Sequence, residues 1–179
     1  TAQRKEIDAR LSIINYILED IEMKYQITEK TIPAAVVYYS ETTLERHQDA
    51  MQWIPSLGKE FLQLNPGIKC AEPAYEFCEY LDGEYREKQI HIRHNEAVAS
   101  RGMESGRIKF REIPETRVIS IYHKGPYERI GEAYAYIMRY AEENGYQITS
   151  SARECYIDGI WNKDSEEDWL TEIQLPARR

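Results

Sequence analysis

The sequence predicts an α+β fold: two strand-helix-strand-strand units that form a mainly antiparallel sheet with a central cleft, preceded by a dimerisation helix. The first observation behind this is a repeat of an Ile-Pro step and a Glu-Arg step, first at Ile32-Pro33 and Glu45-Arg46 and again at Ile113-Pro114 and Glu128-Arg129. The second is that short alternating apolar runs flank two segments of helical spacing. A groove between repeated units is a natural place for a small molecule.

Before the first repeat, apolar residues follow the 4-3-4-3 spacing of a heptad stripe, at Ile7, Leu11, Ile14, Leu18 and Ile21. This spacing predicts that residues 1–24 form a coiled-coil-like helix through which two copies of the chain dimerise. The alternative is an ordinary amphipathic helix lying on its own domain, because so few heptads are a weak coiled-coil signal.

The rest of the chain, residues 25–179, is expected to form one domain whose first repeat covers about 25–98. A helix across residues 44–64 should begin at a capping box formed by Thr42 and Glu45. Pro55 should kink that helix or end it early. The strands of this repeat are predicted near residues 25–31, 34–39, 74–81 and 89–94.

The second repeat is expected over residues 107–179, after a linker at 99–106 that is rich in Gly and Ser. Its helix should start at Gly125-Pro126 and end at Asn144-Gly145, because Pro at the first helical position and Gly just past the end are typical helix boundaries. Ile130, Tyr134, Ile137 and Ala141 form its buried stripe. The strands are predicted near residues 108–113, 117–123, 152–161 and 168–175.

The composition excludes several classes of protein. A net charge of −8 and a pI near 5.1 argue against a nucleic-acid surface on this segment, because phosphate binding needs clustered Lys and Arg. Three cysteines without a CxxC motif fit reduced thiols of a cytoplasmic protein. Neither a transmembrane run nor a signal peptide is found, so we expect a cytoplasmic protein without membrane contact.

Alternation along the last two strands selects two acidic residues. Glu154 and Tyr156 share one face of their strand, and Ile173 opposes Glu172 on the next. If Ile157 and Ile173 pack beneath the helices, both glutamates and Tyr156 face the concave side where the repeats meet. A carboxylate among aromatic rings suits a lipophilic cation. The alternative is that both are surface glutamates of an acidic protein.

Fourteen tyrosines against three phenylalanines predict a pocket with aromatic walls and polar tips. The alternative is that each ring is a half-exposed strand residue, because strands favour aromatics without any ligand. The residues chosen to line the pocket are Tyr38, Tyr122, Tyr156 and Trp161, with Tyr75 and Trp53 from the first repeat.

Other combinations of reactive side chains do not predict chemistry. His91 and His94 lie three apart on a strand and point to opposite faces, so we expect no metal site. His123 and Cys155 have no third orienting group, and Cys155 is expected in the core. The sequence therefore predicts no catalytic residue, metal or cofactor.

Three motifs resemble the GyrI-like effector-binding domain: Gly-Pro-Tyr-Glu at 125–128, Arg-Glu-Cys-Tyr-Ile at 153–157 and Thr-Glu-Ile-Gln-Leu-Pro at 171–176. The resemblance extends from Tyr25 to Ala177, and the preceding helix is similar to the dimerisation helix of MerR-family multidrug-responsive regulators. It implies a cavity for hydrophobic, often cationic, compounds, with the pocket glutamate at Glu154 and an acidic position at Glu172. The first repeat departs from the pattern, because residues 40–45 lack Gly-Pro-Tyr-Glu.

The resemblance implies the ligand-sensing and dimerisation part of a MerR-family transcriptional regulator. Its partners would be a small-molecule effector, a second copy of the chain through the N-terminal helix, and DNA through a domain upstream of this segment. One alternative is a small-molecule hydrolase of the same superfamily, in which Glu154 activates water and Tyr156 orients it. Another is a protein-binding inhibitor module.

Overall fold

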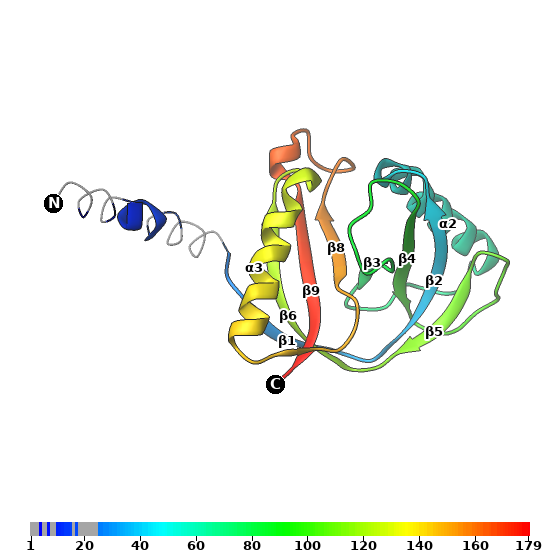
Figure 1. Cartoon of the computed structure of the whole chain (residues 1–179). Helices are drawn as coiled ribbons and strands as arrows, with labels where there is room; N and C mark the ends of the chain where they lie inside the picture. The colour runs from blue at the N-terminus through cyan, green and yellow to red at the C-terminus, as the bar shows by residue number, and fades with distance from the viewer. Residues whose placement is uncertain (1–3, 5–6, 8–9, 16, 18–24) are drawn as a thin grey trace.

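A computed structural model of the chain describes residues 4, 7, 10–15, 17 and 25–179. Residues 25–179 form a curled sheet with two helices on it, which confirms the predicted α+β fold (Figure 1). The strands are β1 (Thr28–Ile32), β2 (Ala35–Leu44), β3 (Glu76–Tyr80), β4 (Ile90–Val98), β5 (Lys109–Ile113), β6 (Thr116–Lys124), β7 (Gln147–Ile148), β8 (Arg153–Asp158) and β9 (Leu170–Arg178). The helices are α2 (Ala50–Leu64) and α3 (Ile130–Glu143).

The sheet has the strand order β1-β6-β9-β8-β3-β4-β2-β5, with β7 paired to β9, and its strand pairs are antiparallel. The first repeat supplies β2, α2, β3 and β4, and the second supplies β6, α3, β8 and β9. A seam between β3 and β8 joins the two repeats through the pairs Cys78 with Glu154 and Glu79 with Arg153 (Figure 1).

Each repeat lends its first strand to the other. β1 pairs with β6, where Ile32 lies opposite Thr116, and β5 pairs with β2, where Ile113 lies opposite Ala35. The chain crosses between the two halves directly after each Ile-Pro step. The repeats therefore cannot separate without breaking two strand ladders besides the seam.

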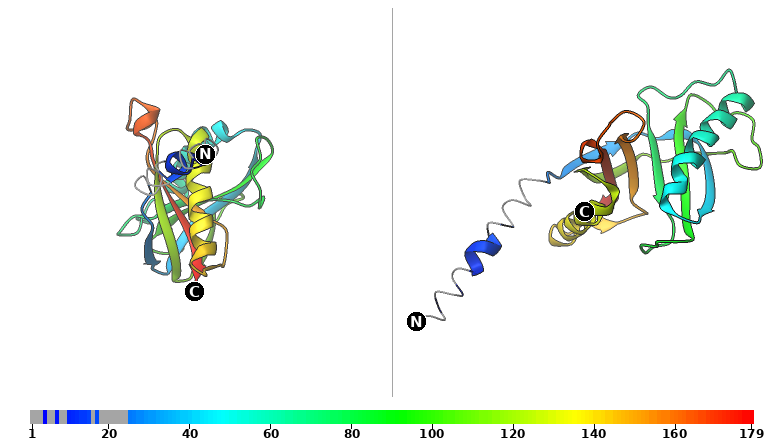
Figure 2. Two further views of the ribbon diagram at one scale, coloured as in Figure 1. Left: turned by 60° about the vertical axis from the view of Figure 1, so that its left-hand side comes forward. Right: turned by 90° about the horizontal axis from the view of Figure 1, so that it is seen from above.

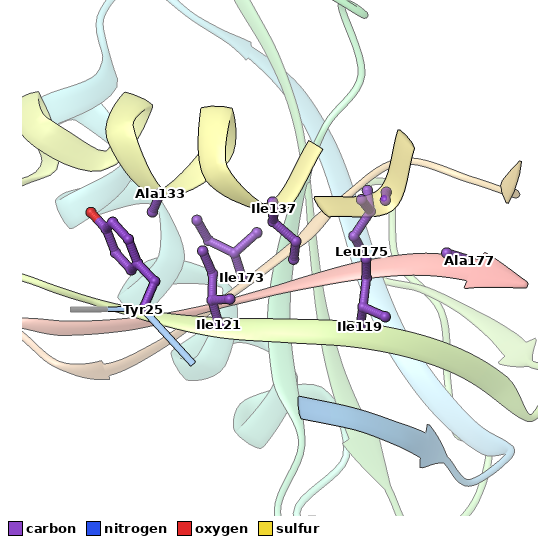
Figure 3. Packing of buried hydrophobic residues seen from close by; sticks show 9 residues of the cluster. Tyr25, Ile119, Ile121, Ala133, Ile137, Ile173, Leu175 and Ala177 are labelled. Carbon is purple, nitrogen blue, oxygen red and sulfur yellow. The ribbon is translucent and has the colours of Figure 1, made fainter. Parts of the chain in front are cut away.

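Both helices cover the same side of the sheet, which we call the helix face. Ala133, Ile137 and Ala141 recur every four residues along α3 and pack on β6 and β9, where Ile121 and Ile173 are fully buried (Figure 3). In the other half α2 packs through Leu57 and Phe61 on Tyr38, Val98, Ile108 and Phe110. Each half of the sheet thus has its own helix (Figure 2).

The opposite side of the sheet, the concave face, is also buried. Curling brings β5 and β8 together, so that Ile113, Phe77 and Cys155 share one apolar cluster with Val37 and Ala97. Cys155 is therefore in a core, as expected, but not in the core beneath the helices. The buried charge of Glu79 on this face is paired: its Oε2 accepts hydrogen bonds from three side chains, Arg93 (3.3 Å), Asn95 (3.1 Å) and Arg111 (3.0 Å).

One detail of the first repeat differs from the sequence prediction, and another excludes one of two predicted outcomes. The capping box at Thr42 is wrong, because β2 continues to Leu44 in its ladder with β4, and the box instead joins Arg46 and Asp49 at a 3-10 turn before α2. Pro55 lies inside α2 and does not end it. The buried contacts of Leu57 and Phe61 hold the helix on the sheet beyond the proline.

Three of the five residues of the predicted heptad stripe are described. Residues 10–15 are helical, and Ile7, Leu11 and Ile14 are each about half exposed. Leu18 and Ile21 lie outside the described residues. Among the residues that are described, no helix is both long enough and apolar enough to cross a membrane.

The core beneath α3 gives a direct stability test. Replacing Ile137, which is fully buried, with Ala should lower the free energy of unfolding by about 2–5 kcal/mol through lost burial and a residual cavity. Its neighbour Met138 is 45% exposed, so Met138→Ala should cost no more than about 0.5 kcal/mol. Urea unfolding of both variants checks this, and equal losses would contradict the packing.

Candidate functional site

A buried carboxyl group lies on the helix face beside the seam. Glu154 is 5% exposed, and its strand partners are Ile173 on β9 and Cys78 on β3. Residues directly opposite in an antiparallel ladder share a face, so Glu154 lies on the side that carries α2 and α3. Its side chain therefore projects where the two repeats and their helices meet.

Tyrosine hydroxyls from three different elements converge near this carboxyl. The hydroxyl of Tyr156 donates to Glu154 Oε2 at 3.2 Å, and Tyr134 of α3 also hydrogen-bonds to the carboxylate. The hydroxyl of Tyr80, from β3, lies 2.8 Å from that of Tyr156. Because Tyr156 donates to the carboxylate, Tyr80 donates to Tyr156. We call these four residues, with Tyr127, the Glu154 cluster.

Burial dominates the electrostatics of the cluster. Desolvation raises the pKa of Glu154 to about 7, and the hydrogen bonds from Tyr156 and Tyr134 oppose that rise. Burial and the nearby Glu154 charge hold the pKa values of Tyr80 and Tyr156 well above their usual range. Near neutral pH the phenols are therefore donors, and the carboxyl group is divided between its charged and neutral forms.

Aromatic rings surround the carboxyl. The ring of Tyr127 meets that of Tyr156 edge-on at 5.7 Å between centroids and lies 5.0 Å from Trp169. From the α2 side, Trp53 packs in the same apolar cluster as Tyr80 and Tyr156. The four tyrosines of the Glu154 cluster are only half-buried, whereas the carboxyl is buried. A ligand that reaches Glu154 must therefore displace part of this aromatic cover.

This arrangement suits a cation with an apolar body. A positive charge stabilises the ionised form of a buried carboxylate, and aromatic ring faces attract cations as well. Tyr156 and Tyr134 hydrogen-bond to the carboxylate, and Tyr80 hydrogen-bonds to Tyr156. The same groups could also hold a water molecule for general-base chemistry, because a carboxyl with a pKa near 7 is a competent base.

The structure does not bring Glu172 together with Glu154. Glu172 lies on the concave face, where it forms an ion pair with Lys30 and accepts a hydrogen bond of 2.7 Å from Ser120. The assumption that Ile157 and Ile173 share the core was wrong: Ile157 is 42% exposed, whereas Ile173 is fully buried opposite Glu154. Both faces of this curled sheet are covered, so alternation alone did not reveal which face carries the helices.

The six aromatic residues predicted from the sequence are dispersed. Tyr156 belongs to the Glu154 cluster, and Trp53 packs against it. Tyr38 is buried under α2, where it stacks on Phe61 at 4.3 Å. The other three are farther from Glu154: Tyr75 and Tyr122 lie on the concave face with Gln174 and Lys30, respectively, and Trp161 is exposed in the loop after β8.

Sequence reasoning missed Tyr80, Tyr127 and Tyr134 as site residues. Tyr127 belongs to the Gly-Pro-Tyr-Glu motif, which served as a helix start and as a family motif but not as a source of site residues, and Tyr134 was assigned to the buried stripe of its helix. Both assignments describe the local role of the residue and say nothing about its distant partner. The excess of tyrosine over phenylalanine was the one signal that pointed to them.

A surface depression lies elsewhere, along β2 and the loop before β5. Of the residues predicted for the site, it includes only Trp53. Its lining residues are Tyr39, Ser40, Glu41, Thr42, Trp53, Gly106, Arg107 and Lys109. Because Glu154 does not line it, the depression does not define the candidate site.

Comparisons with solved structures show two strong similarities. This chain is 39% identical in sequence to the matching chain of a cryo-EM structure of an EcmrR-DNA complex in EcmrR-RPo, with a TM-score of 0.84. The match covers 99% of this chain and 68% of that chain. This chain is 41% identical in sequence to the EcmrR C-terminal domain in its crystal structure, with a TM-score of 0.81. The match covers 87% of this chain and 98% of that chain. A hydrolase from Listeria innocua shares the fold alone, at 12% identity and a TM-score of 0.62, covering 86% and 92%.

A comparison with curated proteins gives no match. A family model described as the GyrI-like small molecule binding domain matches residues 23–178, which includes every strand, both helices and the Glu154 cluster. The resemblance inferred from the sequence motifs is thereby confirmed, and the chain belongs to the family of GyrI-like small molecule binding domains.

Proposed function

We propose that this chain is the ligand-sensing and dimerisation part of a MerR-family transcriptional regulator, and that it binds hydrophobic cations at the Glu154 cluster. The similarity to EcmrR in a DNA complex supports the regulator context. The choice of ligand rests on the buried carboxyl of Glu154. Burial and two tyrosines shift its pKa, and no lysine or arginine among the described residues does so.

Two other buried glutamates have basic partners, which makes the environment of Glu154 unusual in this structure. Glu79 is bound by Arg93 and Arg111, and Glu172 is paired with Lys30. A buried carboxylate without such a partner carries an uncompensated desolvation cost. A cationic ligand relieves that cost, and a neutral ligand of the same shape does not.

The signal would pass by population shift. A ligand that binds one dimer geometry more tightly than another biases the dimer toward that geometry, by no more than the difference between the two affinities. α3 supplies Tyr134 to the cluster and packs on β6 and β9. Displacement of the aromatic cover by a ligand would therefore act first on this helix and on the loop that carries Tyr127.

The proposed dimer forms through the N-terminal helix. Ile7, Leu11 and Ile14 share the heptad spacing and are each about half exposed. Pairing these stripes between two copies would bury apolar surface that the domain at residues 25–179 leaves uncovered.

Replacing Glu154 with Gln should discriminate between charged and neutral ligands. We expect the affinity for an aromatic quaternary ammonium compound to fall at least about 10-fold, equivalent to about 1.4 kcal/mol. The affinity for its uncharged carbon analogue should change by less than about 3-fold, because Gln preserves the shape of the site. Isothermal titration calorimetry of both compounds gives the two ratios.

Glu172→Gln is the matched comparison, since Glu172 is an equally buried glutamate on the other face that already has Lys30 as its partner. Its ratio of cation to neutral affinity should stay at the wild-type value. Equal losses for both ligands in Glu154→Gln, or a larger loss in Glu172→Gln, would contradict the proposal.

Stability should depend on pH through Glu154. The pKa of this residue is about 7 in the folded state and 4.5 in the unfolded reference, so the folded state holds the proton more tightly. The contribution of Glu154 to the free energy of unfolding is fully present below pH 4.5. It falls by on the order of 3 kcal/mol as the pH rises to about 7.

Because Gln does not titrate, the free energy of unfolding of Glu154→Gln relative to wild type should increase by that amount between pH 4.5 and 8. Urea unfolding at several pH values measures the difference. A difference that does not change with pH would show that the carboxyl has an ordinary pKa.

A hydrolase is the second candidate, favoured by the raised pKa of Glu154 and its 3.2 Å contact with Tyr156. In that reaction Glu154 would take a proton from water as the water attacks an electrophilic substrate. Incubating the protein with an aromatic ester and following the ester by chromatography distinguishes the two functions. A sensor leaves the ester intact, whereas turnover that is lost in Glu154→Gln would establish the hydrolase.

Dimerisation is tested on the whole chain. Leu11→Asp places a charge in the middle of the heptad stripe and should convert a dimer to a monomer, because the charge would have to be buried at the contact. Leu62→Asp, at a residue of α2 that is 61% exposed, is the control and should stay dimeric. Size-exclusion chromatography with light scattering gives the masses, and a wild-type monomer would refute the dimer.

A further inference from the structure

Four side chains with metal-binding donor atoms gather on the helix face of the first repeat. Donor atoms of Glu76, His94 and Glu96 all lie within 4.8 Å of one another. His94 Nε2 lies 2.6 Å from Glu76 Oε1, and Cys70 Sγ donates to Glu96 Oε1 at 3.1 Å. The four residues come from β3, β4 and the segment before β3, so only the tertiary fold assembles them.

The cluster carries negative charge that no basic side chain offsets. Glu76 and Glu96 are direct partners in the β3–β4 ladder, and like charges opposite each other destabilise a sheet. Among the described residues, neither carboxylate has a lysine or arginine within ion-pair distance, and the one ion-pair partner found is His94. Glu41 on β2, by contrast, is paired with Arg93.

The surroundings of His94 also point to a ligand. Its ring is 1% exposed, its Nδ1 has no hydrogen-bond partner, and Nε2 contacts only the exposed Glu76. Nε2 is the nitrogen that faces the carboxylates, so it is the one that could bind an ion together with Glu76 and Glu96. Imidazole is also the commonest protein ligand for metals.

We propose that Cys70, Glu76, His94 and Glu96 form a binding site for a divalent transition metal ion of the Zn²⁺ type. Thiolate, imidazole and carboxylate are the donors that Zn²⁺ prefers, and four of them suit its tetrahedral geometry. Metal–ligand bonds of about 2.0–2.3 Å place neighbouring donors about 3.5 Å apart. Among Glu76, His94 and Glu96 the separations of 2.6–4.8 Å bracket that value. Cys70 Sγ lies 3.1 Å from Glu96 Oε1 but outside that group of three, so its side chain must move toward the other two ligands when the ion binds.

The hydrogen bonds of the four proposed ligands indicate how these side chains would rearrange when the metal ion binds. The Cys70 thiol gives up its proton to solvent, and its sulfur changes from a donor to Glu96 into a metal ligand. Glu96 Oε1 is thereby freed for the metal, while Glu96 Oε2 keeps its 2.5 Å hydrogen bond from Tyr38, in the way outer-shell partners hold ligating carboxylates. Cys70 and Glu76 are exposed, which gives the ion a path to the buried His94.

This site is separate from the proposed function. His94 and Glu154 lie on opposite sides of β3, because Cys78 is the ladder partner of both. None of the four proposed ligands is a member of the Glu154 cluster. Loss of metal binding would leave the cation proposal unaffected, and the reverse also holds.

The test uses the untagged chain after treatment with a chelator. Titration with Co²⁺, which substitutes for Zn²⁺ and absorbs light, should produce a thiolate-to-cobalt charge-transfer band and the intense visible bands of four-coordinate Co²⁺. Zn²⁺ should remove both, because it binds the same ligands more tightly. Absence of these bands from the wild-type protein would overturn the proposal.

Variants assign the ligands. Cys70→Ser should abolish the charge-transfer band, and Glu76→Gln and Glu96→Gln should each weaken Zn²⁺ binding by at least about 10-fold. His91→Ala is the control: His91 is on the same strand as His94 but belongs to the opposite face, beside Glu41, so binding should be unchanged.

Thermal unfolding of each variant without metal checks that it folds. Cys70 and Glu76 are exposed, so their replacements should fold normally and keep the test decisive. A band that survives in Cys70→Ser, or equal weakening in His91→Ala, would refute the assignment.

Discussion

The seam between β3 and β8 is the constraint on which the rest of this structure depends. It places two ladder pairs between the repeats, and one of these pairs contains Glu154. Because the helices cover one face of the joined sheet, the side chain at this position meets Tyr80 from the other repeat and Tyr134 from α3. The exchange of β1 and β5 reinforces the seam by tying each repeat to the other at its far edge.

The seam brings different kinds of buried charge to the two faces. On the concave face, Glu79 and Glu172 have basic partners, which offset the cost of removing a carboxylate from water. On the helix face, the partners found for Glu154 among the described residues are phenols, and burial raises its pKa although their hydrogen bonds oppose the rise. The concave charges therefore fit a structural role, because their bonding capacity is satisfied within the chain. The charge on Glu154 can still be compensated by something that arrives from outside.

The first repeat carries a further group of charged side chains on the helix face. Glu76 and Glu96 face each other there beside a buried His94. The sequence argued against a metal because His91 and His94 point to opposite faces, and that statement about the pair holds in the structure. That reasoning compared the two histidines with each other and left out Glu76 and Glu96, whose donor atoms lie within 4.8 Å of His94 in the structure.

The sequence by itself determined the repeat, the order of strands and helices, and which neighbours on one strand share a face, such as Glu154 with Tyr156. These properties follow from local spacing, because side chains alternate every residue along a strand and recur every three or four residues along a helix. Only the tertiary structure decided that Glu154 shares its face with Ile173 instead of Glu172, and that Tyr80 and Tyr134 approach it. The reason is that ladder register and helix docking are set by contacts between distant segments, and both faces of this curled sheet are buried, so hydrophobicity did not distinguish them.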